Sequence, residues 1–148
     1  MSAFKKRSSP EPVHFRDILI LKSEPRQILR VETFLEKINK KLRLDETKYH
    51  RLLVATTEAV NNGMIHGNKR LPEKEVTLTC EVKRNVLVIT IEDEGSGIDP
   101  KRLPDPLAKE NLLRENGRGV FLMRTLMDEI SFRKGKKRSA VIMAMKMK

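Results

Sequence analysis

The sequence predicts an α+β fold, a two-layer α/β sandwich in which one mostly antiparallel sheet carries helices on one face. Three observations support this prediction. Apolar residues recur at every second position in some segments, which predicts strands, and at every third or fourth position in others, which predicts helices. The predicted order is strand, two helices, two strands, loop, helix, two strands. The 148 residues leave room for a single core. With no Trp and only 5 Phe, aliphatic side chains and the 7 Met must fill that core.

The first elements are expected to be an arm, a strand and a helix. Residues 1–12 are basic and rich in Ser and Pro, which is typical of a flexible arm. Aliphatic and β-branched residues predict a strand over 13–22. Apolar residues at spacings of three and four then predict an amphipathic helix over 25–43, with its Lys and Arg side chains facing outward.

A second helix and a hairpin are expected in the middle of the chain. Asp45 is a good N-cap for a helix that stops at Gly67. Strict alternation of apolar and polar residues over 76–82 predicts a half-buried strand. A tight connection at residues 84–85 leads into a further strand over 86–92, so these two strands are expected to form an antiparallel hairpin.

The last part of the chain begins with a change in composition. Residues 93–119 contain four Gly and three Pro, which predicts a long functional loop. A short helix is expected over 120–127 because apolar residues recur there at helical spacing. Two final strands, around 130–133 and 140–147, are expected to be joined by a basic turn.

The chain is strongly basic, with 31 Lys and Arg against 20 Asp and Glu and a net charge of +11. Such a charge attracts nucleotides, nucleic acids or acidic proteins, and a basic surface that serves only solubility is an equal alternative. Direct nucleic-acid binding is disfavoured because the few Phe are scattered and supply no stacking platform for bases.

The cysteine content and the apolar runs indicate the compartment. Cys80 has no partner for an internal disulfide, and its place in an alternating strand predicts a reduced, partly buried thiol. No apolar run approaches the roughly 20 residues that span a bilayer. We therefore expect a cytoplasmic protein that does not insert into a membrane.

Polar side chains interrupt the second predicted helix near its end. Glu58 and Asn62 are four residues apart, so a carboxylate and an amide project from the same face about one turn apart. Asn61 and His66 extend this polar end. A solvated helix face explains the same residues, and that alternative stays open for this motif taken alone.

Two glycine motifs flank the predicted loop. Asp93 ends a predicted strand, where its carboxylate can accept a hydrogen bond from a ring amino group, and Gly95 and Gly97 let the backbone approach a flat ligand. The sequence Gly-Arg-Gly at 117–119 opens a helix whose free amide groups, with Arg118, can bind phosphate. An ordinary turn and a flexible hinge explain each motif singly.

Basic residues lie within and beside this loop, at Arg102, Lys109, Arg114 and Arg118. Their charges could close over a polyphosphate as a lid. A solvated basic segment is an equally good explanation, so these residues count only together with the flanking motifs.

Taken in order, these motifs resemble the GHKL ATP-binding superfamily and, within it, the small bacterial anti-sigma factor serine kinases. Residues 58–62 with Ile-His-Gly at 65–67 look like the N box of that family. Residues 93–97 look like its first glycine box, and residues 117–120 with Leu-Met at 122–123 look like its second. The resemblance implies one GHKL-type ATP-binding domain over 13–148.

The resemblance implies ATP and Mg²⁺ as ligands and assigns roles to several residues. Asn62 would hold the magnesium ion, Asp93 would bind the adenine amino group, and Glu58 would act as the general base. Gly95 and Gly97 would shape the base pocket. The phosphates would be contacted by Gly117, Arg118 and Gly119.

Two implied assignments depart from the family pattern. Ser139 stands where the family often has a threonine near adenine, but Arg138 replaces the usual preceding glycine. Arg114 stands one place farther from Gly117 than the arginine that contacts the γ-phosphate in well-studied members. Arg118 is the alternative for that contact.

The resemblance also implies a function in transcription regulation. An anti-sigma factor of this kind would transfer phosphate from ATP to a serine of a STAS-type anti-anti-sigma protein, sequester a sigma factor, and form a homodimer as its relatives do. The alternative is a nucleotide-gated protein-binding module without phosphotransfer. A sensor histidine kinase is disfavoured because His14, His50 and His66 belong to no separate phospho-accepting helix.

Overall fold

The structure, a computed structural model, describes residues 14–95 and 115–148, and only the backbone of 115–117. The strands within these ranges are β1 (Phe15–Lys22), β2 (Glu75–Lys83), β3 (Val86–Asp93), β4 (Glu129–Lys134) and β5 (Ser139–Lys146). The α-helices are α1 (Ile28–Leu42), α2 (Glu46–Asn62) and α4 (Glu115–Leu126). A 3₁₀ turn, η1 (Pro25–Gln27), precedes α1, and a π-helical turn, η2 (Gly63–Gly67), follows α2.

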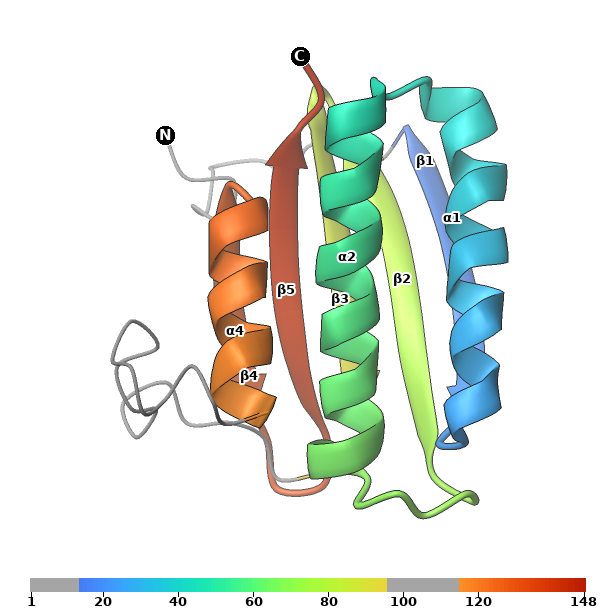
Figure 1. Ribbon diagram of the computed structural model, residues 1–148, viewed down its shortest axis with the longest axis vertical. Helices are drawn as coiled ribbons and strands as arrows, with labels where there is room; N and C mark the ends of the chain where they lie inside the picture. The colour runs from blue at the N-terminus through green and yellow to red at the C-terminus, as the bar shows by residue number, and fades with distance from the viewer. Residues whose placement is uncertain (1–13, 96–114) are drawn as a thin grey trace.

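The strands form one sheet in the order β1-β2-β3-β5-β4, and each neighbouring pair is antiparallel. All three described α-helices lie on one face of this sheet, with α2 in the middle (Figure 1). The predicted fold class, an α+β two-layer sandwich, is confirmed. The arm expected at 1–12 lies outside the described residues.

The core lies between the helices and the sheet. Alternate residues of the central strands point to the helices, so Leu78 of β2, Ile89 of β3 and Met143 of β5 are fully buried. Methionine fills much of this core, as its composition predicts. The buried methionines are Met64, Met123, Met127, Met143 and Met145.

Local signals set the boundaries of most elements. Asp45 caps α2 as predicted, because its side chain accepts a hydrogen bond from the backbone N–H of Lys48 at 2.8 Å. The helix expected over 25–43 begins instead with η1, where Pro25 stands at the first position. Arg43 ends α1 in the left-handed conformation, with φ at 54°.

The prediction of a loop over all of 93–119 is wrong at its end, because α4 begins at Glu115. Gly117 and Gly119 are poor helix formers, which is why this segment looks like a loop. Packing overrides that preference: Val120 and Met123 are buried, and they belong to the core cluster that α2 shares.

One end of the molecule collects the segments that carry the polar motifs. The C-terminal end of α2, the N-terminal end of α4, the end of β3 and the start of β5 all lie there (Figure 1). The β3–β5 register places Asp93 directly opposite Ser139. The fold therefore brings segments from distant parts of the sequence to one site.

The face of the sheet opposite the helices carries apolar residues in solvent. Ile18 and Ile20 on β1 are 45% and 50% exposed. Among the described residues, no helix has both the length and the apolar character needed to cross a membrane.

Candidate functional site

A cavity opens at the end of the molecule where the polar motifs meet. Its open volume, with the solvent at the mouth included, is about 570 Å³. Ile91, Met123 and Val141 give it apolar walls. Asn62 and Asp93 place polar groups at two positions along those walls. The cavity thus combines apolar walls with a few polar atoms.

Asp93 is the last residue of β3, and one oxygen of its carboxylate is fully engaged. Oδ1 accepts hydrogen bonds from the hydroxyl of Ser139 and from the backbone N–H of Gly95, each at 2.8 Å. Among the described residues, no donor reaches Oδ2. That oxygen lies toward Gly63, which also lines the cavity. Within the part of the chain that the structure describes, Asp93 therefore has one carboxylate oxygen left for a ligand.

Burial raises the pKa of Asp93 above its ordinary value, and the hydrogen bonds from Ser139 and Gly95 act in the opposite direction. The raised pKa means that the ionised carboxylate is held here at a cost in free energy. An acceptor kept at a cost inside a cavity is typical of a binding site.

Two glycines allow the backbone to pass close to Asp93. A Cβ atom on Gly67 would lie 2.3 Å from Cγ of Asp93, and a Cβ atom on Gly95 would lie 2.3 Å from the carbonyl oxygen of Gly67. No side chain fits at either position. The sequence indicates Gly67 as the end of a helix and as part of the segment that resembles the N box, and in the structure its missing side chain makes room for the carboxylate.

Glu58 and Asn62 of α2 meet the start of α4 at Gly119. A Cβ atom on Gly119 would lie 3.0 Å from Nδ2 of Asn62 and 3.2 Å from Oε2 of Glu58. The absence of a side chain at this position lets α4 approach the two polar groups closely. Arg51 of α2 also ties the helices together, because its Nε donates to the carbonyl oxygen of Leu126 at 3.0 Å.

Asn62 is not part of a solvated helix face, which was the open alternative for this motif. The residue is 8% exposed, and its Nδ2 is buried without a hydrogen-bond partner among the described residues. An unpartnered buried amide costs free energy unless a ligand or water satisfies it. Asn62 therefore indicates where a polar ligand atom would be bound. Glu58 beside it is half-buried.

The structure places the remaining predicted site residues as follows. Gly117 and Arg118 lie in the first turns of α4, and the side chain of Arg118 is exposed. Ser139 is buried against Asp93. Gly97 and Arg114 lie outside the described residues, as do Arg102 and Lys109.

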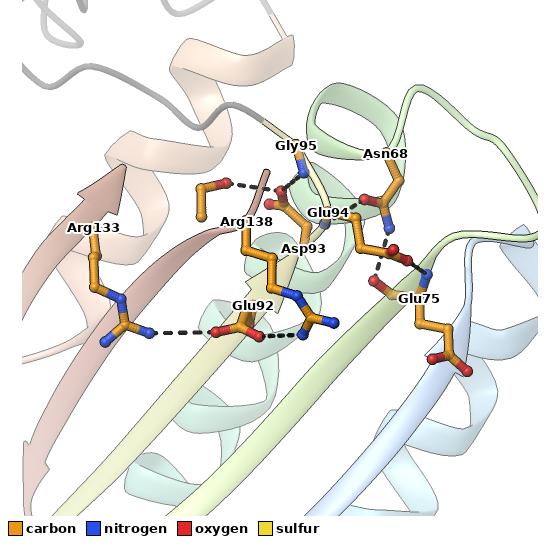
Figure 2. Close-up of polar contacts among 9 residues, drawn as sticks. Asn68, Glu75, Glu92, Asp93, Glu94, Gly95, Arg133 and Arg138 are labelled. Carbon is orange, nitrogen blue, oxygen red and sulfur yellow. Dashed lines mark hydrogen bonds and ion pairs between the residues drawn. The ribbon is translucent and has the colours of Figure 1, made fainter. Parts of the chain in front are cut away.

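The site also contains a residue that the sequence analysis did not single out. Asn68, which follows η2, is completely buried and hydrogen-bonds to both β2 and the turn after β3 (Figure 2). An Asn next to Gly and Lys is an ordinary turn residue in a sequence. Its contact with Ser23, 45 positions away, leaves no local signal.

Two basic residues near the end of the sheet, Arg133 at the end of the predicted strand 130–133 and Arg138 in the predicted basic turn, are paired with one carboxylate. Arg138 contacts Glu92 at 2.9 Å, and Arg133 contacts the other oxygen of that carboxylate at 3.5 Å (Figure 2). Both arginines are exposed, so each pair stabilises the fold little. Part of the basic charge of this turn is nevertheless balanced within the chain.

Together, these groups fit a ligand with a flat ring and a polar tail. Asp93 can accept a hydrogen bond from the ring, the apolar walls can contact its faces, and Asn62 with Glu58 can meet the tail. Comparison with known proteins agrees with this arrangement. The family model for the "Histidine kinase-like ATPase domain" matches residues 21–145, which include every described site residue.

Relatives and a solved structure show the same likeness. The chain is 35% identical over 97 residues to the anti-sigma F factor of Clostridium novyi (strain NT), covering 64% of this chain and 68% of that protein. It is 35% identical over 77 residues to the anti-sigma F factor of Bacillus subtilis (strain 168), covering 51% and 53%. The fold resembles the RsbU and RsbW domains of Rv1364c from Mycobacterium tuberculosis, with a TM-score of 0.67, 12% identity, and coverage of 89% of this chain and 32% of that one.

Proposed function

Because the chain belongs to the histidine kinase-like ATPase domain family, we propose that it is an anti-sigma regulatory factor that binds Mg-ATP. Over the domain at 13–148, it would phosphorylate a serine of a STAS-type anti-anti-sigma protein and sequester a sigma factor. The observation that carries the proposal is the carboxylate of Asp93, which has one oxygen held by Ser139 and Gly95 and the other free beside an apolar cavity.

The base of the nucleotide would bind at the Asp93 end of the cavity. Oδ2 of Asp93 would accept a hydrogen bond from the 6-amino group of adenine. Ile91 and Val141, which line the cavity, would contact the faces of the ring. Gly95 would let the ring approach the backbone, and the family resemblance assigns the same role to Gly97, which lies outside the described residues. An amino group requires a hydrogen-bond acceptor, and the Asp93 carboxylate is such an acceptor in its ionised form, although burial raises its pKa.

The phosphates and the metal would bind where α2 meets α4. The buried amide of Asn62 fits both groups: its Nδ2, which lacks a partner among the described residues, can donate to a phosphate oxygen, and its Oδ1 is the atom that would hold the metal. Asn62 would hold Mg²⁺ jointly with phosphate oxygens, because this ion takes few protein ligands and shares the rest with phosphates and water. When bound, Mg-ATP supplies the phosphoryl group and the positive charge that stabilises its transfer. Gly117, Arg118 and Gly119 would contact the phosphates. The γ-phosphate would be contacted by Arg114 or, as the alternative, by Arg118.

Glu58 is the residue that we assign as general base. Its Oε2 lies beside Asn62 and Gly119 at the phosphate end. There, Glu58 orients the hydroxyl of the incoming serine and accepts its proton. Positioning of this kind is most of what a protein contributes to phosphoryl transfer.

Partners and assembly follow from the same proposal. The sigma factor and the STAS protein would bind as alternative partners in the cytoplasm, without a role for a membrane or for direct contact with nucleic acid. A homodimer is the expected assembly, and exposed Ile18 and Ile20 on β1 offer an apolar surface for it.

The test is transfer of labelled γ-phosphate from ATP, with Mg²⁺, to a STAS protein encoded by the same genome. The wild-type chain is expected to label one serine, and Glu58→Ala is expected to lose labelling while it still binds ATP. Undiminished labelling by Glu58→Ala would exclude Glu58 as the base. ATP-sensitive capture of a sigma factor with no labelled serine would favour the nucleotide-gated binding module instead.

A further inference from the structure

Asn68 lies where four segments of the chain meet beside the proposed base pocket. Its backbone N–H donates to the carbonyl oxygen of Gly63 at 2.8 Å, which is the bond that closes the π-helical turn η2. The residue is 0% exposed. A buried amide side chain is stable only if its donors and acceptor are satisfied, so its hydrogen bonds define its orientation.

The side chain of Asn68 satisfies that condition. Nδ2 donates to Oγ of Ser23 at 2.8 Å and to the carbonyl oxygen of Glu75 at 3.0 Å. Oδ1 accepts the backbone N–H of Glu94 at 2.7 Å. A flipped amide would set its NH₂ group against that N–H, so the chemistry of the neighbours allows one orientation only.

The bond from Glu94 matters because Glu94 follows Asp93. Its N–H belongs to the peptide group that links the two residues, and the next N–H, that of Gly95, donates to Oδ1 of Asp93. The side chain of Glu94 is held as well, since it accepts the backbone N–H of Glu75 (Figure 2). The turn that carries the Asp93 carboxylate is thus fixed to β2 and η2 through Asn68.

We propose that Asn68 is a positioning residue for base recognition, acting through the Asp93–Glu94 peptide to hold the Asp93 carboxylate in its binding orientation. The inference rests on the proposed nucleotide site. Asn68 itself does not line the cavity. Its loss would let the turn rotate, so that Oδ2 no longer points at a fixed position in the pocket.

The network contains a matched control. The hydroxyl of Ser23 accepts from Asn68 and donates to the carbonyl oxygen of Lys74 at 2.9 Å, so it is a buried member of the same network. Ser23 has no hydrogen bond to Glu94 or to Asp93 among the described residues. Ser23→Ala therefore weakens the network but keeps the bond that holds the turn. Asn68→Ala weakens the network and also removes that bond.

The test compares the affinity for Mg-ATP with that for purine riboside triphosphate, which lacks the 6-amino group. In Asn68→Ala, the preference for ATP is expected to fall about tenfold, which corresponds to one lost hydrogen bond to a charged group. In Ser23→Ala, the preference should stay within about twofold of wild type, whatever its melting temperature. If Asn68→Ala does not fold, Asn68→Leu, which keeps a similar volume, carries the same expectation.

The outcomes separate the two proposals. A wild-type preference retained in the Asn68 variants, or lost equally in Ser23→Ala, would overturn the positioning role. A wild-type chain that binds neither nucleotide would instead overturn the proposed function.

Discussion

Ser139 donates its hydroxyl hydrogen to Oδ1 of Asp93 at 2.8 Å, from the first residue of β5 to the last residue of β3. The two residues are also directly opposite each other in the antiparallel register. The hydrogen bond thus joins the two strands at the point where the proposed base pocket begins, and it leaves Oδ2 as the oxygen for a ligand.

Removing this hydroxyl is expected to weaken ATP binding. Ser139→Ala leaves Oδ1 with the N–H of Gly95 alone, so the carboxylate is less well oriented, and we expect affinity to fall about three- to tenfold. Ser139→Thr keeps the hydroxyl and should bind almost as wild type. Calorimetric titration of each variant with Mg-ATP measures the difference. Ser131→Ala, on β4, serves as the control, and an equal loss there would contradict the assignment.

The two glycines at either end of η2 should respond differently to the same substitution. Gly67→Ala places a methyl group 2.3 Å from Cγ of Asp93 and is expected to lower the free energy of unfolding by about 1–3 kcal/mol. A Cβ atom on Gly63 would meet Val76 at 3.4 Å and Asp93 at 3.5 Å, which are ordinary contacts. Gly63→Ala should therefore be neutral, or stabilise the protein by up to about 1 kcal/mol. Urea denaturation measures the free energy of unfolding of both variants. Equal destabilisation would contradict the close approach of Gly67 to Asp93.

Asp93→Asn is expected to stabilise the ligand-free protein at neutral pH. Burial raises the pKa of Asp93, so the folded state binds the proton more tightly than the unfolded state. The resulting stabilisation is present below the ordinary aspartate pKa of 3.8 and is lost as pH rises through the folded-state pKa. The neutral Asn avoids this loss, and its amide oxygen can still accept from Ser139 and Gly95.

The free energy of unfolding of Asp93→Asn should thus exceed that of wild type by about 1 kcal/mol at pH 7. The difference should shrink as pH falls toward 3.8. Denaturation curves across this range provide the measurement. A variant that is less stable at pH 7, with a difference that does not depend on pH, would show that the buried carboxylate carries no such cost.

Cys80 is expected to be inert in the folded protein. Its side chain is 0% exposed, and burial raises the pKa of its thiol to about 12, so the reactive thiolate is scarce at neutral pH. A thiol-specific reagent such as dithionitrobenzoate should label Cys80 only when urea unfolds the chain. Rapid stoichiometric labelling under native conditions would contradict the buried position on β2.

The elements with a clear period could be predicted from the sequence because that signal is local. Strict alternation predicted β2, the tight connection after it predicted β3 as its hairpin partner, and Asp45 predicted the start of α2. The start of α4 at Glu115 was predicted only approximately. The glycine motif at 117–119 was expected to open a helix, but the low helix propensity of Gly117 and Gly119 extended the predicted loop to 119, and packing against α2 overrides that propensity.

The site was predictable to the extent that it depends on spacing. Four residues along one helix place Glu58 and Asn62 on one face, and the structure brings both against Gly119. Contacts between distant segments produce no comparable spacing pattern in the sequence. The bond between Asn68 and Ser23 and the pairing of Arg138 with Glu92 each depend on the strand register, which a single sequence does not specify.

The most direct test of the central claim is a titration of the wild-type chain and Asp93→Asn with Mg-ATP. The variant is expected to be at least as stable as wild type at neutral pH, so a loss of binding cannot be assigned to unfolding. We predict saturable binding to wild type and at least about a tenfold lower affinity for Asp93→Asn. Equal affinities of the two proteins, or a wild-type chain that binds no ATP, would contradict the account.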